Sequence, residues 1–330
     1  MTEVELPAGQ RGRILHGEKL WTLGSCFADE IGRRMERDLF DVEVNPFGPL
    51  YNPLSILAAI RRIAGNIPVE ESELFEHGGL YHSFDFHSRF SSTAREKLAR
   101  DLTAIINRLH GQLKDLKVVT LTLGSARGFE LCDSGRIVAN CHKLPASRFS
   151  PVDIPIEAIE RAVSEIYATL RGFSPDVMLV VTVSPIRHKA YGYHADRVGK
   201  SRLLVALDNF IRSVSPQWGP IPGIVYFPAY EIMDDELRDY RFYAADMIHP
   251  SEVAADYIYQ RLGETFFSDD TFSLCREARS LTSRLLHRPL NASTAHATRA
   301  AAKEASDTFA KLHPALSQAL GRFVSKCYEE

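Results

Sequence analysis

The sequence predicts an α/β protein in which helices cover both faces of a mostly parallel sheet, giving three layers. Three runs carry this prediction: residues 118–123, 177–183 and 223–227 are largely apolar and rich in β-branched side chains. Strands buried on both faces of a parallel sheet have this composition. Helical patterns precede or follow each run, and strands that alternate with helices are typical of this fold class.

The N-terminal part of the chain is expected to supply the first strands and the first helix. After a polar arm over residues 1–17, we predict strands over 19–23 and 42–44 and a helix over 26–39. One apolar face of that helix is indicated by a four-residue spacing of Phe27, Ile31, Met35 and Leu39. Three prolines between residues 45 and 53 exclude regular structure there.

Further helices are predicted from Pro53 onward, where proline suits the first helical turn. The expected ranges are 94–114, 155–171, 200–214 and 251–264. An insertion over 66–92, rich in His and Phe, is expected to contain part of a hairpin, and residues 133–135 a hairpin turn. Two units follow from these patterns: an α/β domain over 18–265, and a peripheral helical C-terminal extension over 268–330 that lacks strand patterning.

Composition sets the class of protein. The 330 residues are 45% apolar and 25% charged, which is typical of a soluble globular chain. A formal charge of −3 gives no electrostatic reason to expect nucleic acid or a membrane surface as a partner. No signal peptide, membrane span or disulfide framework is indicated, so we expect a cytoplasmic protein with free thiols. We expect no cofactor and no metal, because Cys132, Cys141 and His142 lack the close spacing of a zinc site.

The segment Gly24-Ser25-Cys26 is the strongest candidate for chemistry. It joins the first strand to the first helix, and Gly24 allows a sharp turn there. Cys26 would then lie beside the unpaired N–H groups of a helix start, where the helix dipole lowers the pKa of a thiol. Hydrolases present a nucleophile in this way. A buried cysteine that merely packs the turn is the alternative.

A second candidate segment, Asp246-Met247-Ile248-His249-Pro250, precedes the last helix of the α/β domain. An Asp three residues before a His can accept a hydrogen bond from the imidazole, fix its tautomer and stabilise its charged form. Taken alone, the pattern indicates a capping Asp and a surface His. It gains weight because the first strand of the same chain ends in a nucleophile turn, and we expect Cys26 within hydrogen-bond reach of His249.

Residues 24–28 read Gly-Ser-Cys-Phe-Ala, and over roughly residues 18–265 the chain resembles the GSCFA family. The resemblance extends through further motifs at 45–48, 122–124, 140–143, 183–188 and 239–243. That family is similar to the SGNH, or GDSL-type, hydrolases. The resemblance implies that Cys26 takes the place of the nucleophilic serine, and Ser25 that of the preceding aspartate. It also implies that Asp246 and His249 are the terminal catalytic pair, and that Gly48 is the oxyanion glycine, with Gly124 as a further candidate for binding the oxyanion or the substrate.

Two departures from the SGNH pattern stand out. The nucleophile is a thiol, and the loop that begins at Gly124 lacks the oxyanion asparagine. Loss of one oxyanion donor costs on the order of 100–1000-fold in rate. The side chains of Asn45, Asn52 or Asn140, or the N–H groups of Cys26 and Gly48, could replace that donor.

Three other polar side chains are candidates for substrate binding: His142, Arg187 and His188. Each lies at the end of a strand or hairpin, and Arg187 could hold a carboxylate or phosphate by a bidentate contact. The resulting prediction is a hydrolase or acyltransferase that acts on a small-molecule or glycan acyl ester or thioester. Ser25 is the alternative nucleophile. Two other classes stay open: a non-catalytic module that binds a carbohydrate or acyl group, and a redox-responsive protein that uses Cys26 and Cys141.

Overall fold

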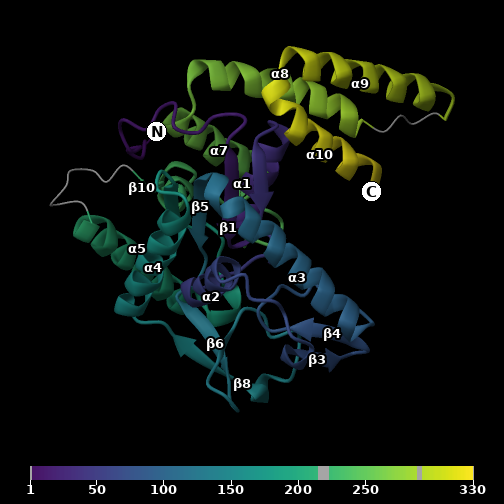
Figure 1. The fold of residues 1–330 in the computed structure, drawn as a ribbon. Coiled ribbons are helices and arrows are strands. Elements are labelled where there is room, and N and C mark those ends of the chain that lie inside the picture. The colour runs from purple at the N-terminus through teal and green to yellow at the C-terminus, as the bar shows by residue number, and fades with distance from the viewer. Residues whose placement is uncertain (1, 215–222, 288–291, 330) are drawn as a thin grey trace.

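Five parallel strands form the central sheet of the computed structural model, which describes residues 2–214, 223–287 and 292–329 (Figure 1). The strands pair in the order β10-β9-β5-β1-β2. Their bounds are Lys19–Gly24 for β1, Asp41–Val44 for β2, Leu116–Leu123 for β5, Met178–Val183 for β9 and Ile224–Tyr226 for β10. The predicted α/β class is confirmed, and each of the three buried runs forms a strand of this sheet.

The order of the strands reverses between β1 and β5. From β1 the chain moves to one side, to β2, whereas from β5 it moves to the other side, to β9 and β10. In open α/β sheets a crevice forms at such a switch point, outside the carboxyl ends of the strands, and ligands bind there. Gly24 ends β1 beside Thr122, and Gly124 directly follows β5. The turn that carries Ser25 and Cys26 therefore lies at the switch point.

Helices cover both faces of the sheet. One face carries α1 (Cys26–Arg37) and α7 (Glu252–Phe266). The other carries α2 (Pro53–Ala64), α3 (Arg95–Gln112), α4 (Ile156–Phe173) and α5 (Tyr193–Val214). Alternate residues of β5 and β9 point to opposite faces of the sheet. Leu121 and Val181 therefore pack on the side of α2 to α5, whereas Val118 and Val180 pack on the side of α1 and α7. The predicted helices are present, and α5 begins seven residues before the expected start at 200.

Two small antiparallel sheets lie at the opposite end of the molecule from the C-terminal helices (Figure 1). One pairs β3 (Leu74–His77) with β4 (Leu80–Ser83), and the other contains β6 (Arg127–Leu131), β7 (Ile137–Val138) and β8 (Phe149–Asp153). The hairpins expected in the 66–92 insertion and around the turn at 133–135 are both present. Neither β8 nor the short helix α6 (Ala229–Glu231) was predicted.

The C-terminal part is helical, as predicted, with α8 (Asp269–Leu286), α9 (Ala292–Leu312) and α10 (Ser317–Glu329). Its first helix is less peripheral than expected, because Cys275 of α8 is 1% exposed and belongs to the same buried apolar cluster as residues of α1 and α7. Residues 288–291 and 330 of the expected extension lie outside the described residues. Among the described helices, none combines the length and the apolar character needed to cross a bilayer.

Candidate active site

Gly24 fixes the turn that presents Ser25 and Cys26. Its φ is 130°, and a Cβ at this position would stand 2.0 Å from the carbonyl oxygen of Thr122. Only glycine allows the chain to leave β1 this close to β5. The Gly24 N–H donates to Asn45 Oδ1 (2.8 Å), and the Ser25 N–H donates to the Thr122 carbonyl (3.1 Å).

Ser25 caps α1 and is 1% exposed. Its hydroxyl accepts a hydrogen bond from the Phe27 N–H (3.3 Å) and donates one to Ser184 Oγ (2.9 Å). A serine at the N-cap commonly uses its oxygen in this way. Both contacts of the hydroxyl thus hold the turn together.

Cys26 is the first residue of α1 and is half-buried. Its Sγ lies 3.0 Å from the hydroxyl oxygen of Tyr51. Burial is the largest influence on this thiol and raises its pKa, while the hydrogen bond from Tyr51 and the residue's own N–H act in the opposite direction. The expectation that the helix start leaves the thiol with a lowered pKa is therefore wrong, because desolvation outweighs the helix terminus.

Tyr51 belongs to the site although its role was missed at the sequence level. Its carbonyl accepts hydrogen bonds from the N–H groups of Gly124 (2.9 Å) and Ser125 (2.8 Å), and its ring lies edge-on to His188, with 5.7 Å between ring centroids. The available signal was its place in the proline-rich loop between β2 and α2, which the sequence identifies only as irregular.

Asp246 and His249 form an oriented pair. Asp246 Oδ2 lies 2.6 Å from His249 Nδ1, while Oδ1 accepts hydrogen bonds from the N–H groups of Ile248 (2.9 Å) and His249 (3.0 Å). The hydrogen bond with the imidazole has the largest effect, and together with the two backbone hydrogen bonds it lowers the pKa of Asp246 to about 2. A carboxylate at Nδ1 places the proton of the neutral ring there and leaves Nε2 as the basic nitrogen.

The loop of Asp246 and His249 is tied to the end of β5 through two neighbouring residues. The Arg187 N–H donates to the Ile248 carbonyl (3.2 Å), and His188 Nε2 lies 3.2 Å from the Gly124 carbonyl. Burial chiefly, together with the charge of Lys200, lowers the pKa of His188 to about 4. Within the described part of the chain, no hydrogen bond joins Cys26 to His249.

Lys200 is a second residue of this region that was missed at the sequence level. It is 2% exposed, and its ammonium group donates to the carbonyls of Gly124 (2.7 Å) and Ser184 (2.8 Å), which follow β5 and β9. Burial lowers its pKa to about 8. The lysine therefore holds together the segments that follow two central strands, one of which contains Ser184, the partner of Ser25.

The glycines expected to bind the oxyanion do not offer free donors. The Gly48 N–H donates to the Asn45 carbonyl (2.7 Å), and the Gly124 N–H donates to Tyr51. Asn45 itself is 1% exposed, and its side-chain amide bonds the Ser25 carbonyl (3.2 Å) and Asp29 Oδ1 (2.6 Å). These groups brace the loop around Cys26 and are not aimed at a substrate.

Asn52 is engaged through both halves of its amide, since Nδ2 donates to Ser55 Oγ (2.9 Å) and Oδ1 caps α2 at the Ser55 N–H (2.9 Å). Asn140 uses its Oδ1 to accept the His142 N–H (2.7 Å). His142 is 4% exposed, bonds the Ser83 carbonyl through Nε2 (2.7 Å) and packs on His82. Burial lowers its pKa to about 4. These contacts correct the expectation that His142 binds substrate, because they place it in the packing between the two small sheets.

Arg187 lies among aromatic rings. Its guanidinium carbon is 4.2 Å from the ring centroid of Tyr243, 5.6 Å from that of Tyr240 and 5.8 Å from that of Tyr193. Such contacts stabilise a cation over aromatic faces. They orient the side chain beside the loop that carries His249.

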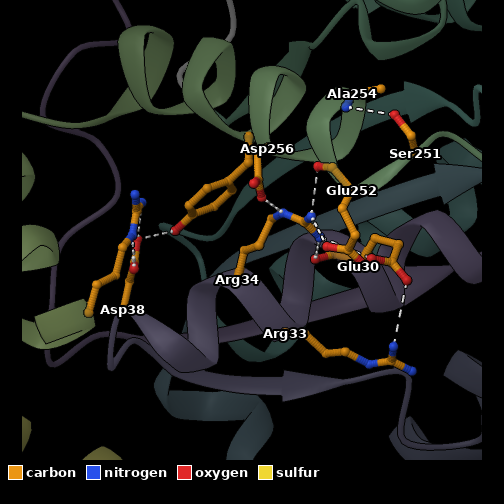
Figure 2. Close-up of polar contacts among 10 residues, drawn as sticks. Glu30, Arg33, Arg34, Asp38, Ser251, Glu252, Ala254 and Asp256 are labelled. Atoms are coloured by element: carbon orange, nitrogen blue, oxygen red, sulfur yellow. Dashed lines mark hydrogen bonds and ion pairs between the residues drawn. The ribbon is translucent and has the colours of Figure 1, made fainter. Parts of the chain in front are cut away.

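Arg34 connects the helices that follow the two candidate segments, α1 after Ser25 and α7 after Pro250 (Figure 2). Its side chain is 7% exposed and bonds Asp256 Oδ1 (2.7 Å), Glu252 Oε2 (2.8 Å) and Glu30 Oε2 (2.9 Å). It also donates to the Glu252 carbonyl (3.2 Å), in the first turn of α7. Arg34 thereby fixes the helix that begins at Cys26 against the helix that begins after His249.

No cluster of three or more His, Cys, Asp or Glu side chains in the described ranges is arranged to hold a metal ion. The GSCFA family model matches residues 19–262. This chain belongs to the GSCFA family. No curated protein sequence matches it.

Solved structures include two weak likenesses, each at 11% identity and covering 79% of this chain and 99% of the other. One is a carbohydrate esterase family 3 protein from Talaromyces cellulolyticus, with a TM-score of 0.39. The second is a mutant acetyl esterase with an acetate ion, with a TM-score of 0.36. Likenesses of this size carry no conclusion about the chemistry of the GSCFA chain.

Proposed function

We propose that this GSCFA protein is an acyl-transfer enzyme that cleaves an ester or thioester, with Cys26 as nucleophile and His249 and Asp246 as its acid–base pair. One observation carries the proposal: Asp246, fixed by two backbone N–H groups, binds His249 Nδ1 at 2.6 Å on a loop tied to the strand end beside Cys26. A protein that only binds a ligand has no use for an imidazole oriented in this way.

The reaction begins when His249 Nε2 takes the thiol proton of Cys26. The thiolate attacks the carbonyl carbon, a C–S bond forms, and the C=O electron pair moves onto oxygen. Collapse of this intermediate restores the C=O bond and expels the alcohol or thiol, which takes the proton from the imidazolium. Water or a second acceptor then releases the acyl group by the same steps. Catalytic hydrogen bonds are often long in an enzyme without substrate and tighten in the complex, so His249 has to approach Cys26 during the cycle.

Ser25 is the weaker candidate for nucleophile, because its buried hydroxyl already bonds Phe27 and Ser184. A second function class also has support. The N–H groups of Gly48 and Gly124 are occupied, which favours a non-catalytic module that binds an acyl or carbohydrate ligand. A redox role would use Cys26 and Cys141, both free thiols. A small-molecule or glycan substrate and a cytoplasmic setting complete the proposal.

The test is turnover of short-chain acyl esters and acyl thioesters by the full chain and its variants. We expect Cys26→Ala and His249→Ala each to abolish turnover, with little further loss in the double variant because the pair acts as one unit. Asp246→Asn should be nearly as damaging, and Ser25→Ala milder. Activity in Cys26→Ala together with inactivity in Ser25→Ala would move the nucleophile by one residue. Turnover that survives His249→Ala would refute the assigned acid–base pair.

A further inference from the structure

We infer that Tyr51 is a further catalytic residue of this site, whose hydroxyl binds the Cys26 thiolate before attack and the oxyanion after it. The second role rests on the acyl-transfer function proposed above. Tyr51 would supply the donor that an asparagine provides in the related hydrolase pattern and that the loop at Gly124 lacks.

The first argument is distance. Tyr51 Oη lies 3.0 Å from Cys26 Sγ, a close approach for a hydrogen bond to sulfur. In an acyl-enzyme the carbonyl oxygen is two bonds from that sulfur. A hydroxyl that touches the sulfur therefore reaches the carbonyl oxygen after a small shift of the side chain. Stabilisation of an oxyanion requires a donor that lies within reach of the developing charge in this way.

The second argument is that the main chain around Tyr51 is fixed on three sides. The Leu50 N–H donates to the carbonyl of Gly24 at the end of β1 (2.7 Å), and the Tyr51 carbonyl accepts two N–H groups that follow β5. The next residue, Asn52, caps α2. A donor held by three elements needs little reorganisation when charge appears on the substrate, which is the condition for oxyanion stabilisation.

The third argument is that the two candidate glycine donors are occupied. The N–H groups of Gly48 and Gly124 are bonded within the protein, and the Tyr51 carbonyl itself takes that of Gly124. Tyr51 therefore occupies the Gly124 N–H with its carbonyl and places its own hydroxyl beside the thiol. The phenol thus adds a donor to the N–H of Cys26, which lies in the first turn of α1.

Electrostatics agree with this geometry. Burial and the nearby carboxylates of Asp29 and Glu30 disfavour the thiolate of Cys26, and the hydrogen bond from Tyr51 is the largest influence that favours it, lowering the thiol pKa. Removal of the hydroxyl should therefore move the thiol pKa further upward.

The first experiment needs no substrate. Alkylation of Cys26 by iodoacetamide, followed by mass spectrometry of its peptide, is measured against pH in the wild type and in Tyr51→Phe. We expect the midpoint to rise and the rate below it to fall roughly three- to tenfold, as loss of one hydrogen bond implies. Tyr81→Phe removes a phenol hydroxyl from β4 and should leave the profile unchanged. An unchanged profile in Tyr51→Phe would overturn the inference.

The second experiment is acyl turnover. Tyr51→Phe should lower kcat by about 100–1000-fold with little change in KM, the signature of a donor that acts in the transition state. An unchanged kcat alongside a shifted alkylation profile would overturn the oxyanion role alone. If the wild type turns over no acyl substrate, the acyl-transfer proposal and the oxyanion role fall together, and the alkylation profile still decides whether Tyr51 supports the thiolate.

Discussion

Replacement of Arg279 in α8 by methionine should destabilise the whole α/β domain. Arg279 Nη2 lies 2.7 Å from Asp38 Oδ2, and its Nε bonds the other carboxylate oxygen. Asp38 ends the helix that begins at Cys26, and its side chain is 0% exposed (Figure 2). A buried carboxylate that loses its cation cannot be rehydrated without local opening of the structure.

The magnitude follows from the unequal burial of the two partners. Removal of one member of a buried ion pair costs about 3–5 kcal/mol. The Arg279 side chain is 53% exposed, so solvent screens part of the attraction, and the hydroxyl of Tyr259 remains 2.8 Å from Asp38 Oδ2. We therefore expect the lower end of that range, about 3 kcal/mol, for Arg279→Met. Asp38→Asn should cost less, about 1 kcal/mol, because the exposed guanidinium can return to water.

Urea unfolding of the full chain measures these free energies. Arg276→Met is the control, since Arg276 lies on the same helix and its guanidinium bonds only the nearby Ser273 hydroxyl within the described residues. Once Asp38→Asn has removed the buried charge, adding Arg279→Met should cost little more. A loss below about 1 kcal/mol in Arg279→Met, or a larger loss in Asp38→Asn, would refute the argument from the buried charge.

Three further predictions concern Arg34, His142 and Gly24. Arg34→Lys keeps the charge but loses the guanidinium group that bonds Glu252 and Asp256 at the same time. Because α1 and α7 are then less firmly held together, kcat should fall while far-UV circular dichroism is unchanged. The pKa of His142 is near 6.5 in the unfolded chain and only about 4 in the folded protein, so stability should fall as pH drops through that interval, by up to about 3 kcal/mol. His142→Asn, which suits the positive φ there, should flatten this slope in urea titrations. Gly24→Ala should prevent folding to a soluble monodisperse protein, because its Cβ would overlap the Thr122 carbonyl.

Most of the fold could be predicted from the sequence because its strongest signals are local. A run such as 177–183 has no polar face, so it could only be a strand covered on both sides, and β9 is buried throughout. The four-residue spacing from Phe27 likewise identified the inner face of α1. The buried role of α8 could not be predicted in this way, since Arg279 reads as an ordinary surface arginine until Asp38 is placed opposite it.

The candidate site was predictable only in part, for a related reason. Local spacing identified Asp246 and His249, because three residues suffice to bring a carboxylate to an imidazole. Cys26 and Tyr51 are separated by 25 residues and meet only because β1 and β5 pair and the loop after β2 folds across their ends.

The part of the oxyanion expectation that concerned the glycines could not be decided from the sequence either. A glycine pattern shows where the backbone can turn, but not which carbonyl will take the N–H of Gly48 or Gly124. That choice is made by the loop that ends at Tyr51. One loop residue, Tyr51, thus occupies a main-chain donor with its carbonyl and places its hydroxyl beside the proposed nucleophile, and only the tertiary arrangement determines both contacts.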